Sequence, residues 1–147
     1  MIAPLTFDNI SQFLPLVRAY QEFYQVAKIN DERNQLHFAR FIDDTHRGIV
    51  FLATRENAAI GFCTIYFSFS SARAEEIAIL NDLYVDPSWR QNGIGKSLIL
   101  HALAETKTRG LTRLQWLTGK NNVTAKRLYD SLPVSKSDWT LYAMDAS

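Results

Sequence analysis

The sequence predicts one α/β domain over residues 1–147, with a central mixed β-sheet and helices on both faces. Its length is that of an ordinary single domain, and no repeat, linker or low-complexity segment divides it. Residues 49–85 consist of β-branched and aromatic runs separated by short polar turns, a pattern typical of antiparallel strands. A strand, helix and strand pattern follows, and this crossover makes the predicted sheet mixed.

The first elements are a short strand and two helices. Residues 2–7 are expected to form the strand, and Thr6 or Asp8 to cap the helix that follows. Apolar residues recur at helical spacing in this helix, and Pro15 should kink or restart it within residues 12–16 because proline lacks an N–H group. The two helices are expected over residues 10–24 and 32–43.

The middle of the chain is expected to be an antiparallel run of three strands. Residues 49–54 and 60–69 are rich in β-branched and aromatic side chains and flank a polar turn at 56–58, which predicts a hairpin. A second polar turn at 70–74 leads into the third strand, residues 76–85.

The C-terminal elements begin at a glycine turn. The turn opens into a helical pattern of apolar residues, and a short β-branched run and a second amphipathic helix follow it. Pro133 and the polar residues after it predict a loop or a very short strand over residues 133–138. The expected elements are helix 93–109, strand 112–118, helix 125–132 and a final strand 139–144.

Composition excludes several classes of protein. The net charge of the chain is +1, which argues against a nucleic-acid-binding protein, so we expect no nucleic-acid partner. No signal-like N-terminus and no bilayer-length apolar run is visible, so we expect a cytoplasmic protein without a membrane partner. The single Cys63 lies in an apolar run and predicts a buried thiol. His37, His46 and His101 lack metal-ligand spacing, so no metal site is expected.

Charge is unevenly distributed along the chain. Residues 90–127 contain many cationic side chains, Lys126 among them, and Glu105 is the only acidic residue in this range. Residues 75–86 carry acids and no base. The cationic half suits a polyphosphate ligand and the acidic strand suits a cationic amine, although each charged residue could equally belong to a solvated face.

The glycine turn itself predicts a phosphate site. Residues 91–97 place free backbone N–H groups at a helix N-terminus, where the helix dipole also favours negative charge. A P-loop of an ATP hydrolase would need a glycine where Arg90 stands, and a dinucleotide-binding turn would need one where Leu98 stands. Both of these alternatives are therefore disfavoured.

Two motifs identify a resemblance. Arg90-x-x-Gly93-x-Gly95 and Asn122-x-x-Ala125-x-x-Leu128-Tyr129 resemble the pyrophosphate loop and the tyrosine helix of the GNAT N-acetyltransferases, which use acetyl-coenzyme A. The element order is similar to the GNAT fold, in which the strands at 79–85 and 112–118 splay apart and the pantetheine arm lies between them. The resemblance implies a possible homodimer and these coenzyme-binding residues: Leu83, Tyr84, Val85, Arg90, Gln91, Asn92, Gly93, Ile94, Gly95, Lys96, Ser97, Asn122 and Lys126.

The resemblance also implies catalytic roles. Tyr129 matches the general acid that protonates the departing thiolate, and a phenol with a pKa of about 10 is suited to a thiol with one of about 8.5. An acid must accept a proton from the amine, and Asp82 and Glu76 are the candidates. Polyamine acetyltransferases have Leu-Glu-Asp where this chain has Leu80-Asn81-Asp82, so one carboxylate of that pattern is missing.

The predicted activity is transfer of an acetyl group to a primary amine by direct attack. The amine is that of a polyamine-like small molecule or of a lysine side chain, and it would be recognised by the first two helices, the aromatic strand that contains Tyr66, and the C-terminal tail. The alternative is a non-catalytic sensor that binds acyl-coenzyme A and a partner protein.

Overall fold

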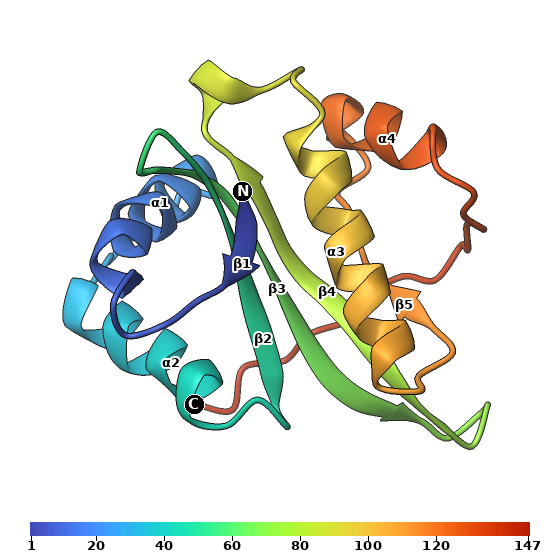
Figure 1. Cartoon of the computed structure of the whole chain (residues 1–147). Helices are drawn as coiled ribbons and strands as arrows, with labels where there is room; N and C mark the ends of the chain where they lie inside the picture. Colours follow the sequence, from blue (N-terminus) through green and yellow to red (C-terminus); the bar gives the residue numbers. More distant parts are fainter. The chain divides into compact units, whose positions relative to one another are not determined.

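A five-stranded mixed sheet organises most of the chain in the computed structural model, which describes all 147 residues (Figure 1). The chain forms two compact units, the larger unit Met1–Leu117 and the smaller unit Thr118–Ser147, which are described separately. The elements of the larger unit are β1 (Ile2–Pro4), α1 (Ile10–Phe23), α2 (Asp31–Asp43), β2 (Gly48–Arg55), β3 (Ala58–Ser70), β4 (Glu75–Val85), the short 3-10 helix η1 (Pro87–Trp89), α3 (Ile94–Thr108) and β5 (Leu114–Gln115). The smaller unit holds α4 (Val123–Asp130).

The sheet has the strand order β1-β2-β3-β4-β5. The first four strands pair antiparallel, and β5 pairs parallel to β4 after the α3 crossover. The turn between β2 and β3 places both Glu56 and Asn57 at positive φ, the geometry of the two-residue hairpin turns that match the twist of a sheet. The prediction of a mixed sheet built from an antiparallel run and a crossover is confirmed.

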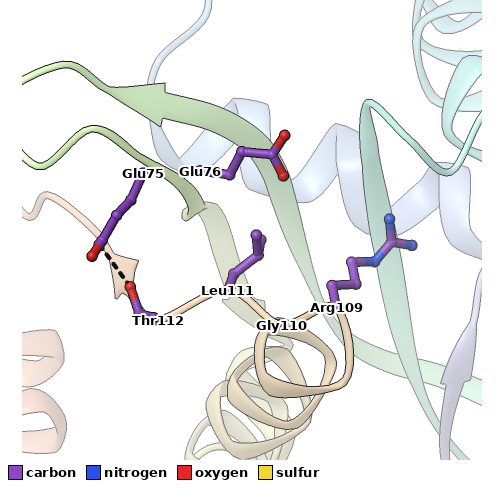
Figure 2. Close-up of a pocket in the computed structure, with 6 residues that line it drawn as sticks. All are labelled: Glu75, Glu76, Arg109, Gly110, Leu111 and Thr112. Carbon is purple, nitrogen blue, oxygen red and sulfur yellow. Dashed lines mark hydrogen bonds between the residues drawn. The ribbon is translucent and has the colours of Figure 1, made fainter.

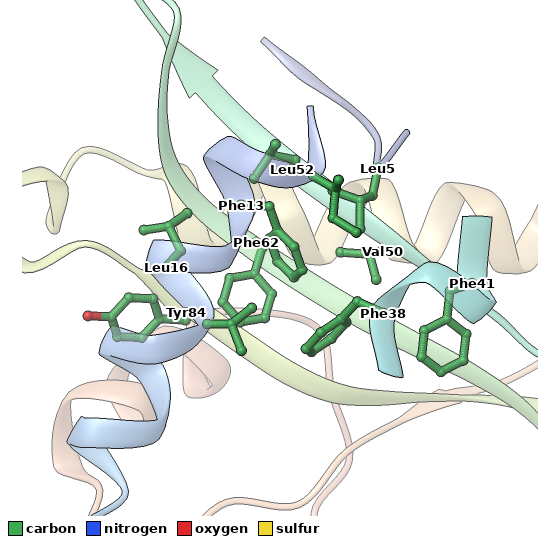
Figure 3. Close-up of a cluster of buried hydrophobic side chains, with 11 residues drawn as sticks. Leu5, Phe13, Leu16, Phe38, Phe41, Val50, Leu52, Phe62 and Tyr84 are labelled. Carbon is green, nitrogen blue, oxygen red and sulfur yellow. The ribbon is translucent and has the colours of Figure 1, made fainter. Parts of the chain in front are cut away.

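Helices α1 and α2 cover one face of the sheet. Phe13 of α1 lies between Phe38 of α2 and Phe62 of β3, with ring centroids 4.9 and 5.0 Å away in edge-to-face geometry (Figure 3). Val50 and Leu52 of β2 point into the same cluster. Edge-to-face aromatic contacts add about 0.5–1.5 kcal/mol each to the burial of the rings, so this cluster fixes the two helices on the strands.

Helix α3 covers the other face. Its residues Leu98, Ile99 and Ala102 are buried, and the Cys63 thiol of β3 lies 3.7 Å from the Leu98 carbonyl. Burial raises the pKa of Cys63 to about 12, which keeps the thiol protonated at neutral pH. Adjacent strand residues point to opposite faces, so Phe62 faces α1 while Cys63 faces α3. The prediction of helices on both faces is confirmed.

The start of α1 differs from the prediction. The strand before it ends at Pro4, and the N-cap of α1 is Asn9, so neither Thr6 nor Asp8 caps the helix. The Asn9 side chain instead accepts a hydrogen bond from the Thr6 N–H and closes the connecting turn. Helix α1 also continues through Pro15 without a restart, because its apolar face is held in the core on both sides of the proline.

The C-terminal part of the prediction is wrong in extent. Strand β5 has two residues where residues 112–118 were expected, and residues 139–144 form no strand. The side chains of Trp139, Leu141 and Tyr142 are exposed. A strand is stable only beside another strand, and the smaller unit has α4 as its single regular element, so this segment has no partner there. None of the helices is long and apolar enough to cross a membrane.

Candidate functional site

The loop between η1 and α3 leaves backbone N–H groups at the start of α3 without acceptors in the protein. Gly93 is the N-cap of α3 and has a φ of 77°, a left-handed conformation that favours glycine. No atom lies within 4 Å of the position that a Cβ on Gly93 would take, so the backbone is open to a ligand on that side. The N–H groups of Ile94, Gly95 and Lys96 donate to no acceptor in the protein and lie at the positive end of the helix dipole.

Two side chains hold this loop in shape. The Asn92 side-chain amide donates to the carbonyls of Trp89 and Arg90, each at 3.1 Å. Arg90 in turn donates through Nε to the Val85 carbonyl at 2.9 Å, and its guanidinium lies 5.6 Å from the ring centroid of Tyr84. Arg90, which was predicted to bind phosphate, therefore ties the loop to the end of β4 and places its charge there.

A β-bulge in β4 shifts the register of its pairing with β3. Ile65 of β3 pairs with Leu80 and Thr64 pairs with Asp82, so Asn81 is the extra residue. The N–H of Asp86 donates to the Ile60 carbonyl of β3. Backbone groups alternate in direction along a strand, so those of Leu83 and Val85 point away from β3.

No strand pairs with the open edge of β4 beyond Ile79. Strand β5 pairs only with Ala78 and Ile79, and β4 continues to Val85 without a neighbour on that side. The backbone groups of Leu83 and the Val85 N–H thus face an edge that pairs with no strand, while the Val85 carbonyl accepts from Arg90 Nε. Such an edge can pair with an extended, amide-bearing ligand as an added strand would.

Asp82 is the buried acid of the site. Its side chain is 8% exposed and accepts two hydrogen bonds on Oδ1, from the Tyr20 hydroxyl at 2.7 Å and from the Asn81 amide at 3.1 Å. The other oxygen, Oδ2, accepts from no group of the protein, yet it is not fully enclosed. The Asn81 amide also lies 3.4 Å from the Tyr66 hydroxyl, which links a second phenol to the same carboxylate.

The two tyrosines near Asp82 hold their protons strongly. Burial raises the pKa of Tyr66 to about 12, and the negative charge of Asp82 contributes to this rise. Burial and then the charge of Asp82 also raise the pKa of Tyr20 far above its usual value. Both phenols are therefore protonated at neutral pH, and Tyr20 can act there only as a donor toward the carboxylate.

A cavity of about 360 Å³ opens between α1, α2 and the bulged part of β4. Asp82 and Tyr20 line it, and so does a reciprocal pair of amides in which Gln21 and Asn34 each donate to the other at 2.8 Å. His37 lines it as well, and burial together with the charge of Arg40 lowers the pKa of His37. The remaining lining residues are Val17, Val26, Lys28, Asn30, Arg33, Phe38, Tyr66 and Asn81.

Glu76 does not belong to this site. It lines a different cavity of about 280 Å³, together with Glu75, Arg109 and Thr112, where β4 begins (Figure 2). Asp82 lies six positions after Glu76, which corresponds to about 20 Å along a strand. Of the two carboxylates predicted as the base, only Asp82 lies at the bulge and lines the cavity between α1 and α2.

Of the other predicted residues, Gln91 (φ of 65°) lies in the glycine turn, Ser97 donates its N–H to the Gly93 carbonyl, and three lie in the smaller unit. The Asn122 side chain accepts from the Ala125 N–H at 3.2 Å and caps α4, one of the two roles expected for it. The Lys126 ammonium donates to the Lys120 carbonyl at 3.1 Å. Tyr129 is half-buried on the predicted apolar stripe of α4.

Sequence reasoning missed Tyr20 and the amide pair of Gln21 and Asn34. Tyr20 lies three residues after Val17 on the apolar stripe of α1, so a phenol at the end of a core stripe was the available signal. No three side chains of the types His, Cys, Asp and Glu are grouped closely enough to hold a metal ion.

Comparisons with known proteins agree with this geometry. The Acetyltransferase (GNAT) family profile matches residues 13–132. An uncharacterized N-acetyltransferase of Bacillus subtilis, YhfO, is 33% identical over 123 residues, which cover 84% of this chain and 81% of that protein. The D-amino-acid N-acetyltransferase HPA3 of Saccharomyces cerevisiae is 33% identical over 129 residues, which cover 86% of this chain and 79% of that protein. The crystal structure of a probable acetyltransferase matches with a TM-score of 0.87 at 25% identity, covering 100% of this chain and 98% of that one.

Proposed function

The chain belongs to the GNAT family of acetyl-coenzyme A-dependent N-acetyltransferases, and we propose that it acetylates a primary amine of a small molecule by direct attack. The yeast relative is named for acetylation of D-amino acids, which supports a small-molecule acceptor over a protein lysine. The size of the cavity between α1 and α2 supports the same choice, because about 360 Å³ encloses a small amine. The observation that carries the proposal is the unpartnered Oδ2 of Asp82 beside this cavity.

The residues present fit the coenzyme. The free N–H groups of Ile94, Gly95 and Lys96 suit a pyrophosphate, and the Lys96 ammonium adds positive charge. The unpaired edge of β4, with both backbone groups of Leu83 and the Val85 N–H, suits the amides of the pantetheine arm. When bound, acetyl-coenzyme A supplies the acyl thioester, and a β4 N–H group can polarise its carbonyl oxygen.

Asp82 is the group that prepares the amine. An alkylamine enters as an ammonium ion with a pKa of about 10.4 and must lose a proton before it can act as a nucleophile. Tyr20 and Asn81 hold Oδ1, so Oδ2 is the atom that accepts this proton, directly or through one water molecule. Asp82 is therefore the base in this proposal, and Glu76 is not required.

Tyr129 is proposed as the general acid for the departing thiolate. The support is the match of residues 122–129 to the tyrosine helix of the family, together with the suitability of a phenol for protonating a thiolate. The family profile spans residues 13–132 and so extends over both units, which supports one catalytic domain over residues 1–147. We also propose that this domain acts in the cytoplasm and can form a homodimer.

The test is an acetylation assay on the purified protein. Acetyl-coenzyme A is supplied with a panel of amino acids, monoamines and polyamines, and release of free thiol is followed together with the mass of the acetylated product. We expect turnover with at least one small amine. Tyr129→Phe should lower kcat by about 10²-fold or more while the Kd for coenzyme A stays unchanged.

Two outcomes would contradict parts of the proposal. Full turnover by Tyr129→Phe would remove Tyr129 from the acid role. Tight binding of acetyl-coenzyme A with no acetylation of any amine would favour the non-catalytic sensor.

A further inference from the structure

The cavity between α1 and α2 carries opposite charges at its two ends. Asp82 lies on β4 with its side chain 8% exposed, so its carboxylate marks the inner end. Lys28 and Arg33 line the same cavity, and both are exposed, so their cationic groups mark the outer end. These three residues are the only charged groups in the cavity lining at neutral pH. His37 also lines the cavity, but its lowered pKa keeps the imidazole neutral.

The two outer cations have no acidic partner. Neither the Lys28 ammonium nor the Arg33 guanidinium makes a salt bridge, whereas Arg18 on the neighbouring helix binds Asp31 at 2.9 Å. Asp31 is the first residue of α2, and its carboxylate pairs with Arg18 and makes no salt bridge with Arg33. The Arg33 backbone N–H donates to the Asn30 side chain, which fixes the start of α2 at the cavity.

Apart from Asp82, Lys28 and Arg33, the lining of the cavity is uncharged at neutral pH. Val17 and Phe38 belong to it, and the reciprocal amide pair of Gln21 and Asn34 ties α1 to α2 beside them. Amide groups already bonded to each other offer little to a charged ligand group. Charge recognition in the cavity is therefore confined to its two ends.

We propose that the acceptor is an amino acid or a similar small molecule that carries a carboxylate as well as a primary amine. Its ammonium group lies toward Asp82, and its carboxylate lies toward Lys28 and Arg33. A polyamine fits poorly, because one carboxylate against two cations leaves the lining with a net positive charge. The inference rests on the proposed function, since it names the substrate class of the same site.

The test measures binding without catalysis. Ligand-observed NMR titrations without acetyl-coenzyme A compare racemic leucine, leucinamide and 3-methylbutylamine, which share a side chain and an amine but differ in the carboxylate. The protein is the wild type, the double variant Lys28→Gln/Arg33→Gln, and Arg47→Gln as a control. Arg47 is exposed and lies outside the cavity, and all three substitutions affect exposed side chains, so the fold is expected to persist.

We expect leucine to bind the wild type and the control at least about tenfold more tightly than either analogue without a carboxylate, because a paired carboxylate gains charge-assisted hydrogen bonds. The double variant should lose this preference. Equal or inverted affinities in the wild type, no binding of any of the three, or a preference that survives in the double variant would overturn the inference. Absence of acetylation despite the expected binding pattern would instead overturn the proposed function alone.

Discussion

The Tyr20 hydroxyl donates a 2.7 Å hydrogen bond to Oδ1 of Asp82, across 62 positions of sequence. This contact joins α1 to the bulged part of β4 and leaves Oδ2 as the oxygen without a partner in the protein. The contact stabilises a buried carboxylate that lines the cavity, and in the proposed function Oδ2 is the oxygen that accepts the proton.

Removal of this donor should destabilise the protein. Hydrogen bonds to charged groups contribute about 1.5–3 kcal/mol, so Tyr20→Phe should lower the free energy of unfolding by about that amount. Tyr24→Phe is the matched control, because Tyr24 is exposed and makes no hydrogen bond through its hydroxyl, and its effect should stay within about 0.5 kcal/mol. Urea denaturation measures both, and equal effects would show that the Tyr20 hydrogen bond adds nothing.

The tyrosines near Asp82 should make the free energy of unfolding depend on pH in the alkaline range. In the unfolded chain a phenol ionises near pH 10, whereas the folded protein holds the Tyr66 proton to about pH 12. The unfolded state therefore loses its proton first, and the contribution of Tyr66 to stability is complete below about pH 10 and declines as the pH rises toward 12. Denaturation midpoints measured along this pH range should fall less steeply for Tyr66→Phe than for the wild type. An identical slope would refute the raised pKa.

The glycine turn before α3 should be sensitive to a side chain at Gly93. Space exists for a Cβ, but the φ of 77° is unfavourable for a non-glycine residue, and Gly93→Ala should cost about 1–2 kcal/mol of stability. Gly93→Asn should cost less, because asparagine tolerates the left-handed conformation better than alanine. Calorimetric binding of coenzyme A should weaken in both variants, since a side chain then stands on the open side of the loop. Unaltered affinity would place the phosphates elsewhere.

Thr64 offers a prediction about stability alone. It is fully buried directly opposite Asp82, and its hydroxyl has no hydrogen-bond partner. Thr64→Val removes this unpaired group at constant shape and should leave stability unchanged or raise it by about 1 kcal/mol. Thr106 is the control, because its buried hydroxyl donates to the Ala102 carbonyl at 2.8 Å and Thr106→Val should lower stability. A loss for Thr64→Val as large as for Thr106→Val would indicate that the Thr64 hydroxyl is paired in solution.

The features that could be predicted from sequence are local. A polar turn within residues 56–58, a glycine at the start of α3 and an asparagine cap on α4 each depend on a few adjacent residues. These features placed the glycine turn before α3 and the antiparallel strands correctly, and phosphate binding at that turn stays a prediction.

The features that escaped prediction depend on distant parts of the chain. The bulge at Asn81 is a property of the pairing between β3 and β4, and the sequence of β4 alone does not reveal it. The same holds for β5, because β-branched residues favour a strand only as far as a neighbour is present to pair. The separation of Asp82 from Glu76 also required the structure, since both are acids of one strand.

The central claim is that Asp82 accepts the proton of an amine bound between α1 and α2. Steady-state kinetics of Asp82→Asn test it most directly, with Asp8→Asn, an exposed acid remote from the cavity lining, as the matched control. Asparagine keeps the shape of the side chain and can still accept the Tyr20 hydrogen bond. We predict that kcat/KM for the amine falls by about 10²-fold or more in Asp82→Asn, with an unchanged Kd for coenzyme A. Wild-type kcat/KM in Asp82→Asn would contradict the claim.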